Sequence, residues 1–580
     1  MLCTVPLGVA AQPVPDAGLR AETQGQWADA IVIYQQSLQA EPAQAHLWER
    51  IADIRAAQLK DPAGAAAALG EAVKYAPDDA RLHAKLSQTQ AVAQQAPAAL
   101  AAINRAVTLE PGNAAYLRAR AEIAAWNGDY AIAEDSYQRL LALAPNDPDA
   151  QLGIARVHHW RGELAKSDRA YQAYLSQHPD AAAARMERIV VVTELGDYAR
   201  AREMLETDGQ RFGESTAYQK QMARVLAWAQ RPTHSLALVD ALAPAHPDDY
   251  ALAYTRTVAL HHAHRPREAL ASLADTTRLR PGSRESADLA RFIRTPLRSN
   301  ATLGLAYSND SDEVSVRRFG ARGEYVINPE TRLFGGGDRQ ALRADVGSGY
   351  EKPDGDPSLD YNRVWLGIQH RISPALSLDA QAGQGRTESD DRLIYQVGMD
   401  IQPTDEWALR LAHRQDLHTV TPRAAALGIE RRASTLDATW TPDLRYTIAA
   451  RLGHDSFSDG NDRWEAQLGP RRAFVRSQSF NLDLGVSGGW FGYDRDSGNG
   501  YYAPSRYQRY ALTAFSYWKL SDDDGISVAL GVGPYKDSTM GGYRTGGDVS
   551  TEGFFGIYRD WYLNEYLVPG GGLEPPHCYQ

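Results

Sequence analysis

The stretch from Gly128 to Gly162, GDYAIAEDSYQRLLALAPNDPDAQLGIARVHHWRG, carries the pattern that decides the fold of the first half of the chain. Its two glycines are about 34 residues apart, and between them lie a small residue, Ala133, and a proline, Pro145. A glycine accepts the left-handed conformation at a helix end, whereas a proline cannot continue a helix. The stretch therefore predicts two helices that join at a glycine turn and are separated from the next pair at the proline.

The same pattern recurs through the first 300 residues or so. Prolines follow one another at about 34 residues or twice that, at Pro42, Pro77, Pro111, Pro145, Pro179, Pro247 and Pro281. Gly213 takes the place of one proline. A small residue stands about a dozen positions before each break, at Ala30, Ala65, Ala99, Ala133, Ser167, Ala201, Ser235 and Ala269. Such a column lets two helices cross closely, and the spacing predicts about eight tetratricopeptide repeats in a superhelix.

The turns and caps give an independent column. Glycines expected between the two helices of a repeat are followed two residues later by a side chain expected to pack inward; the pairs are Gly25 and Trp27, Gly128 and Tyr130, Gly162 and Leu164, Gly196 and Tyr198. After the prolines, Asp79, Asn113, Asp147 and Asp249 are placed to cap the next helix. Three columns in phase make a chance periodicity unlikely.

After Ser299 the pattern changes to alternating segments of about ten residues separated by Asp, Gly, Asn and Pro, which is typical of an outer-membrane β-barrel. About fourteen strands are indicated, centred near Leu303, Ala321, Gly336, Leu366, Ala380, Val397, Leu411, Leu436, Ala449, Ala466, Leu484, Ala514, Leu530 and Gly556. Bacterial barrels close with an even number of strands, and about sixteen are expected here. A soluble β-sandwich, the alternative, would have strands of about five or six residues.

Composition agrees with two large modules in 580 residues. The chain has no run of about 18 apolar residues, and its mean hydropathy is −0.45, so a helical membrane protein is excluded. A net charge of −11, with no basic stripe, argues against nucleic acid as a partner. The two cysteines, Cys3 and Cys578, leave the body of the protein free of thiols, as suits export through an oxidising compartment.

Alternation also predicts which side of the barrel wall each residue faces. Val364, Leu366 and Ile368 are expected to face lipid, as are Tyr446, Ile448, Ala450 and Leu452. Charged and polar residues are expected on the water-filled side; besides Gln369, Arg445 and Thr447, they include the candidate lumen residues Arg322, Glu324, Arg363, Trp365, Asp379, Arg410, Arg414, Asp437, Arg451, Asp455 and Asp483.

The candidate lumen residues have two interpretations. They can be a solvated wall that only keeps the channel wet, which is the commoner case. They can also form a polysaccharide path, with aromatic rings that stack on sugars, carboxylates that attract amino sugars, and Arg and Asp side chains that bind hydroxyls.

Three segments of the barrel half resemble one protein family. Arg414–Ile429 contains an Asp-Leu pair before a Thr-Pro run, Asp455–Trp464 contains a Phe-Ser-Asp-Gly-Asn turn, and Tyr501–Arg506 has an aromatic-x-Pro-x-Arg pattern. With the repeats, they make the chain similar to exopolysaccharide export porins, above all the poly-β-1,6-N-acetylglucosamine export porins. Tyr501–Arg506 also resembles a segment of the cellulose export subunit.

The resemblance implies passive export of a secreted polysaccharide through an outer-membrane barrel. The repeats would lie in the periplasm, where they guide the polymer or dock its synthesis and modification enzymes; a simple spacer is the alternative. Further expected partners are the lipid bilayer and the barrel-assembly machinery. The runner-up function is a surface receptor or adhesin of the phage-adsorption kind, or a cellulose export subunit.

No enzyme, cofactor or metal site is expected. The chain has no P-loop and no nucleophile motif. His158-His159 and His261-His262-Ala-His264 resemble metal ligands, but adjacent helical histidines point different ways and only His261 and His264 would share a face. The acidic pairs, Asp390-Asp391 and Asp522-Asp523-Asp524, fall at predicted turns.

The expected domains are a signal-peptide remnant at 1–12, a repeat solenoid at 13–296, a barrel at 297–563 and an unstructured tail at 564–580. The first twelve residues have an apolar stretch without a basic start, so an ordinary frayed terminus is the alternative. The tail, rich in Gly and Pro, lacks the aromatic-ended strand with which such barrels close, and a truncated barrel of fourteen strands is expected.

Overall fold

The computed structural model describes residues 14–310, 313–477, 479–520, 525–538 and 542–554. The chain forms two compact units, Met1–Val191 and Val192–Gln580. The expected remnant at 1–12, the tail at 564–580, Cys3 and Cys578 lie outside the described residues. The domain boundaries expected at 296 and 563 stay predictions.

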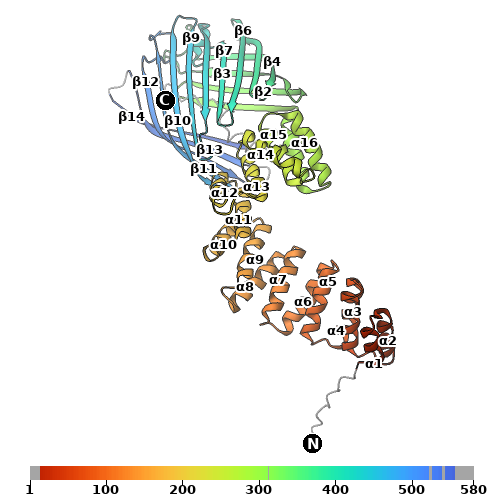
Figure 1. Ribbon diagram of the computed structural model, residues 1–580. Coiled ribbons are helices and arrows are strands. Elements are labelled where there is room, and N and C mark those ends of the chain that lie inside the picture. Colours follow the sequence, from red (N-terminus) through yellow and green to blue (C-terminus); the bar gives the residue numbers. More distant parts are fainter. Residues whose placement is uncertain (1–13, 311–312, 478, 521–524, 539–541, 555–580) are drawn as a thin grey trace. The chain divides into compact units, whose positions relative to one another are not determined.

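The first unit is built of antiparallel helix pairs. Its helices, red to orange in Figure 1, are α1 (Asp16–Thr23), α2 (Trp27–Ala40), α3 (Ala45–Ala57), α4 (Pro62–Tyr75), α5 (Ala80–Val92), α6 (Ala96–Leu109), α7 (Ala114–Asn127), α8 (Tyr130–Leu143), α9 (Pro148–Trp160), α10 (Leu164–Gln177) and most of α11 (Ala182–Glu194). Among the described residues, no helix of the protein has the length and apolar character needed to span a bilayer.

The predicted columns occupy the predicted places. All eight small residues of the column that begins at Ala30 are fully buried. Two members of the column, Ser167 and Ser235, bury a hydroxyl group there. Each hydroxyl donates a hydrogen bond of 2.8 Å to a backbone carbonyl oxygen of the preceding helix, that of Ala155 and that of Ala223 respectively. The helices of a repeat therefore cross where only a small side chain fits.

Caps and turns are confirmed as well. The side chains of Asp79, Asn113, Asp147 and Asp249 accept hydrogen bonds from backbone N–H groups in the first turn of the next helix. Gly25, Gly128, Gly162 and Gly196 have positive φ. In the remaining repeats the same turn position has positive φ without a glycine, at Lys60, Gln94, Gln230 and His264.

The second unit continues the repeats and then changes to a sheet. Its helices are α12 (Tyr198–Phe212), α13 (Thr216–Trp228), α14 (Pro232–Leu242), α15 (Tyr250–His262), α16 (Pro266–Leu279) and α17 (Arg284–Arg294), with short 3₁₀ turns at Ala243–Ala245 and Thr295–Leu297. Gly213, at φ 80°, follows the end of α12, as expected of the residue that replaces a proline there.

Fourteen described strands run side by side in chain order as one antiparallel sheet (Figure 1). They are β1 (Asn300–Asn309), β2 (Ser315–Asn328), β3 (Thr331–Arg343), β4 (Ser358–Ser373), β5 (Leu376–Arg386), β6 (Asp391–Thr404), β7 (Trp407–Leu417), β8 (Glu430–Trp440), β9 (Tyr446–Phe457), β10 (Asp462–Arg476), β11 (Phe480–Tyr493), β12 (Tyr507–Lys519), β13 (Gly525–Asp537) and β14 (Arg544–Phe554). The pairings of the described residues do not join β14 to β1.

The strand prediction is confirmed for every centre that the structure describes. The first thirteen predicted centres fall inside β1 to β13 in order. The fourteenth, Gly556, lies outside the described residues, and β14 ends at Phe554. Most strands have more than ten residues, which argues against a soluble sandwich.

Because the strands form a meander, their connections gather at two ends of the sheet. One end has short turns, such as those between β6 and β7 and between β8 and β9. The other end has the longer connections, among them residues 344–357, 418–429 and 494–506, of which the second holds the short helix α18 (Pro422–Ala426). We refer to these as the short-turn end and the long-loop end.

Candidate functional site: a polar cavity at the short-turn end

The second unit contains a cavity of about 1680 Å³. One side is formed by helix ends of the repeats, with Glu194, Tyr198, Trp228 and His262 on its wall. The other sides are inward-facing residues of the sheet, mostly from β6 to β9. A cavity of this size exceeds the roughly 300–1,000 Å³ of ordinary small-molecule pockets, so it can hold a segment of an extended ligand.

The two faces of the sheet differ as the alternation predicts. On β4, Val364, Leu366 and Ile368 are 61, 67 and 44% exposed. They point away from the cavity, whereas Gln369 lines it. On β9, Leu452 is exposed while Thr447 and Arg451 line the cavity. An apolar outer face with a polar inner face is the arrangement of a membrane barrel.

Two residues of β9 depart from this pattern. Tyr446 and Ala450, expected to face lipid, also border the cavity. Tyr446 is the first residue of β9, at the short-turn end, where the wall meets the repeats and alternation no longer separates two environments.

Five of the candidate lumen residues lie directly on the cavity wall: Arg322, Arg410, Arg414, Asp437 and Arg451. The remaining six do not border this cavity. They are Glu324, Arg363, Trp365, Asp379, Asp455 and Asp483. Alternation therefore gives candidates of which five border the cavity, and it does not tell which residues reach the open space.

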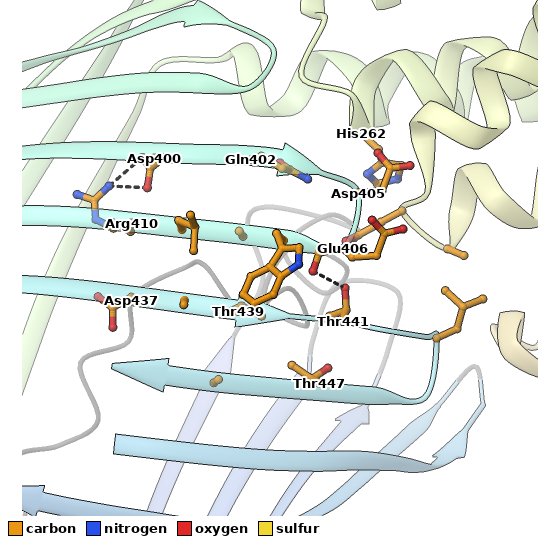
Figure 2. Close-up of a pocket in the computed structure, with 18 of the residues that line it drawn as sticks. His262, Asp400, Gln402, Asp405, Glu406, Arg410, Asp437, Thr439, Thr441 and Thr447 are labelled. Carbon is orange, nitrogen blue, oxygen red and sulfur yellow. Dashed lines mark hydrogen bonds and ion pairs between the residues drawn. The ribbon is translucent and has the colours of Figure 1, made fainter. Parts of the chain in front are cut away.

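Opposite charges on this face are paired between strands, some of them neighbours and some farther apart in the sheet. Arg410 contacts Asp400 at 2.8 Å and Asp379 at 2.9 Å (the pair with Asp400 is drawn in Figure 2), and Arg451 contacts Asp437 at 2.5 Å. The pairs hold long side chains in fixed positions. Their remaining N–H groups and oxygen atoms can bind hydroxyl groups.

Larger groups of charges follow the same rule. Arg363 bridges Asp338 and Asp416 at 2.5 Å each. Asp455 lies between Arg431 at 2.9 Å and Arg463 at 3.2 Å. The partner residues in these groups were not among the predicted ones, although their inward parity is visible in the sequence.

The other members of the candidate set have similar surroundings. Glu324 contacts Arg322 at 3.0 Å, and Asp483 contacts Arg476 at 2.6 Å. Trp365 is not on the wall of this cavity. Its indole lies beside Gly336, where an added Cβ would come within 3.1 Å of it. Its role as a stacking surface for sugar stays a prediction.

The repeats are held to the short turns by a buried arginine. Arg231, before α14, donates hydrogen bonds to the carbonyl oxygens of Asp405 at 3.1 Å and Thr441 at 2.6 Å. Its side chain is 8% exposed. Thr233 adds two bonds to the Asp405 carboxylate, of 2.9 Å from its backbone N–H and 2.7 Å from its hydroxyl. Figure 2 shows Asp405, Glu406 and Thr441 at this end of the strands.

Three further contacts surround this point. His264 is 3.0 Å from Gln402, Arg267 is 2.7 Å from Glu330, and Arg445 contacts Glu203 at 2.5 Å. Burial lowers the pKa of the Arg231 guanidinium, and the neighbouring carboxylates of Glu406 and Asp405 oppose that shift. Sequence reasoning missed Arg231, because nothing in the local pattern separates it from other turn residues.

The histidine segment packs against an aromatic ring of the last helix of the repeats. Burial lowers the pKa of His261 to about 4 and that of His262 well below its usual value, so both rings are neutral at pH 7. The ring of His261 lies 4.5 Å from that of Phe292. The expectation that His261 and His264 share a helix face is wrong, because α15 ends at His262 and His264 follows in a left-handed turn.

The other histidine pair is also explained by packing. His158 Nδ1 lies 2.8 Å from a Glu163 oxygen. Among the described residues, no three His, Cys, Asp or Glu side chains are grouped so as to hold a metal ion. Asp390-Asp391 stands at the start of β6, and Asp522-Asp523-Asp524 lies outside the described residues.

The long-loop end is filled by an apolar cluster that the sequence did not predict. Residues from 418–429 and 494–506 pack on strand ends, and the buried members are Ala424, Ile429, Phe457, Tyr493, Tyr501 and Ala503. The Tyr501 ring stacks on Phe457 at 5.5 Å, and Asn461 donates to its hydroxyl at 3.0 Å. The described residues of these two connections do not line the cavity. All three segments on which the family resemblance rests contribute to this end.

Comparisons with known proteins agree with both modules. Residues 320–539 match the family model described as the PgaA membrane beta barrel domain, and residues 116–167 and 161–207 match a tetratricopeptide repeat model. No curated protein matches the chain.

Solved structures resemble parts of it. A structure of Naa15/Naa10 bound to HypK-THB is 21% identical over 48% of this chain and 43% of its own, with a TM-score of 0.29. A bacterial polysaccharide outer membrane secretin is 15% identical over 44% of this chain and 81% of its own, with a TM-score of 0.35. A tetratricopeptide repeat protein from Parabacteroides merdae is 13% identical over 48% and 96%, with a TM-score of 0.29.

The chain thus spans less than half of the first of these proteins. The family matches cover the repeats and the sheet separately and in the order in which the structure shows them. With tetratricopeptide helices followed by a PgaA-type membrane barrel domain, the chain resembles the outer-membrane export porins that combine these two modules.

Proposed function

We propose that this protein is an outer-membrane porin through which a secreted polysaccharide leaves the cell, with the repeat helices on the periplasmic side. The observation that carries the proposal is the polar cavity of about 1680 Å³, enclosed jointly by the repeats of the second unit and the inner face of a PgaA-type barrel domain. A polymer that enters there meets fixed Arg and Asp pairs on the side of the sheet.

Polysaccharide suits this wall for a chemical reason. Sugars expose hydroxyl groups all along the chain, and a wall of Arg and Asp side chains offers donors and acceptors without a deep specific pocket. Most of these charges are already paired within the protein, so an uncharged segment can pass without leaving a bare charge behind. Passive movement along such a wall needs many weak contacts rather than one strong site.

The orientation follows from the connections of the sheet. Outer-membrane barrels have short periplasmic turns and longer extracellular loops. The repeats contact the short-turn end through Arg231 and Thr233. The proposal therefore places the repeats in the periplasm and the long loops, with Tyr501, at the cell surface.

The finer assignment also belongs to this proposal. A poly-N-acetylglucosamine-like polymer is the substrate that the family resemblance implies, and the periplasmic partners would be the enzymes that synthesise or modify it. The resemblance of Tyr501–Arg506 to a segment of cellulose export subunits keeps a glucose polymer as the second candidate substrate.

The test is a deletion of the gene in its own host, with separate measurement of polysaccharide in the medium and in the periplasm. The proposal predicts that secreted polymer falls at least tenfold, that polymer collects in the periplasm, and that the wild-type gene restores secretion. A deletion strain that secretes normally, but that has lost adsorption of a phage or adhesion to a surface, would establish the receptor function instead.

A further inference from the structure

Three arginines gather on the outer face of the sheet, at the long-loop end of β2 and β3. They are Arg317, Arg339 and Arg343. Arg317 is paired with Ala341, and the other two arginines flank Ala341 along β3, each two positions away. Diagonal neighbours of this kind lie about 7–8 Å apart, within reach of long side chains. We name these three residues the arginine triad.

The arginine triad faces the same way as the apolar outer surface of the sheet. Gly337, which shares its face of β3 with two members of the triad, is paired with Val364 on the outer face of β4. The third member, Arg317, is two residues from Phe319 on β2, which is 58% exposed and is paired with Arg339. The side chains of all three arginines are exposed, so the triad does not belong to the inner wall of the barrel.

The position of the triad along the strands is that of a membrane border. Near the short-turn end of β2, Tyr325 is 64% exposed, as is typical of an aromatic ring at the opposite border. Arg317 is eight residues away along the strand, which is roughly 26 Å of strand and, at a tilt of about 40°, roughly 20 Å of height. The outward positions between them, Phe319, Ala321 and Gly323, are uncharged. This span is close to the apolar band of about 25 Å on an outer-membrane barrel.

The triad brings an excess of positive charge to this border. Among the described residues, its ion pair is that of Arg339 with Asp360 of β4, at 2.6 Å. Arg317 lies over the ring of Tyr307, 5.8 Å from the ring centroid, and this contact orients the guanidinium without neutralising it. In a chain with a net charge of −11, three neighbouring arginines at the edge of an apolar surface favour an anionic ligand.

We propose that the arginine triad binds the phosphate groups of the phosphorylated glycolipid in the outer leaflet of the outer membrane. The inference rests on the orientation given under the proposed function, which places the long-loop end at the cell surface. Guanidinium groups bind phosphate oxygens through two parallel hydrogen bonds and stay charged. Long arginine side chains at a membrane border also lay their stems on apolar surface while their charged ends reach the lipid headgroups.

The surface beside the triad suits the acyl chains of the same lipid. From Arg339 towards the short-turn end of β3, the next two outward positions are Gly337 and Gly335, which carry no side chain. They are paired with Val364 and Leu366 of β4, which are 61% and 67% exposed. A cationic site with an apolar strip next to it matches a molecule that has phosphate at one end and hydrocarbon at the other. Free phosphate would use the cationic part alone.

The experiment uses the full chain in detergent and native mass spectrometry with added lipid A that carries two phosphates. The fraction of protein with bound lipid, measured as a function of lipid concentration, gives a dissociation constant. Lipid A from which both phosphates have been removed and inorganic phosphate are the two comparison ligands.

The test variant is Arg317→Gln with Arg343→Gln. The third arginine of the triad is kept, so that its carboxylate partner stays paired. The matched control is Arg278→Gln with Arg284→Gln, which removes the same charge from side chains of α16 and α17 that are 62% and 92% exposed.

We expect the wild type and the control to bind lipid A equally and the test variant to bind it roughly thirtyfold more weakly, because each basic side chain near a membrane surface contributes about fivefold. The inference is overturned if the test variant binds like the wild type, or if the control loses as much affinity. It is also overturned if the wild type binds the dephosphorylated lipid as tightly, which needs no variant to be tested. Displacement of lipid A by an equal concentration of inorganic phosphate would assign the triad to free phosphate instead.

Secretion by the deletion strain separates this inference from the proposed function. If that strain secretes polysaccharide normally, the proposed function fails whatever the lipid measurement shows. If deletion stops secretion while the test variant binds lipid A like the wild type, only the lipid inference fails.

Discussion

The attachment of the repeats to the barrel turns depends on one side chain, and its removal gives a quantitative prediction. Arg231→Ala deletes two charge-assisted hydrogen bonds, to the carbonyl oxygens of Asp405 and Thr441. Bonds to a charged group contribute about 1.5–3 kcal/mol each. Since Thr233 still holds the Asp405 carboxylate, we expect a loss near the lower end of the sum, about 3 kcal/mol.

The measurement is amide hydrogen exchange of the purified chain in detergent. A loss of about 3 kcal/mol in the local opening free energy corresponds to roughly 100-fold faster exchange. We expect this in α14, at residues 232–242, while β7 and β8 exchange as before. Arg202→Ala is the control, because Arg202 forms an exposed pair with Glu206 on the helix surface, at 2.7 Å, of the kind that contributes about 0.3–0.5 kcal/mol. Exchange in α14 that changes less than threefold in Arg231→Ala would refute the view that this residue holds the repeats in place.

Three further predictions concern local features. Gln94→Gly should stabilise the repeats by about 0.5–1 kcal/mol in urea unfolding, because Gln94 has a φ of 59° that suits glycine. Gly128→Ala, at φ 86°, should destabilise them by a similar amount. Unfolding midpoints equal to that of the wild type in both variants would contradict this prediction. Hydrogen bonding to Arg81, and then to Lys85, lowers the pKa of Glu49 from 4.5 to about 2. The stabilisation that the ionised Glu49 contributes is therefore complete above pH 4.5 and is lost as the pH falls towards 2. Glu49→Gln should flatten this part of an acid-unfolding profile, and an unchanged slope would contradict a stabilising contribution of the Glu49 ion pairs. Tyr501→Ala should raise the single-channel current in a planar bilayer, because it loosens the apolar cluster at the long-loop end. Tyr307→Ala, on the exposed face of β1, should leave the current unchanged. Equal currents in the two variants would show that the cluster does not limit ion flow at this end of the barrel.

The sequence predicts most of this fold because its signals are local and periodic. A helix crossing that accepts only a small side chain leaves a mark in every repeat, and each member of the column from Ala30 to Ala269 is buried. Alternation likewise places strand centres such as Leu366 and Leu436 inside their strands. In each case the environment that selects the residue acts within one turn or one strand.

The rest could not be predicted because it depends on contacts between distant residues. Asp405 and Thr441 lie far from Arg231 in sequence, and they bind it through backbone oxygens that carry no side-chain signal. The helix α18 and Tyr501 are joined only in space. Alternation likewise does not tell that Trp365 lies beside Gly336 of the neighbouring strand and is not on the cavity wall.

The central claim is that polysaccharide passes through the cavity between the repeats and the sheet. Ala449 lines this cavity, and Leu452, on the same strand, is 56% exposed on the outer face. The most direct measurement is secreted and periplasmic polysaccharide in the deletion strain that expresses Ala449→Trp or Leu452→Trp at equal levels in the outer membrane. We predict that Ala449→Trp reduces secretion several-fold and causes polymer to collect in the periplasm, while Leu452→Trp secretes like the wild type; equal secretion by both variants would contradict the claim.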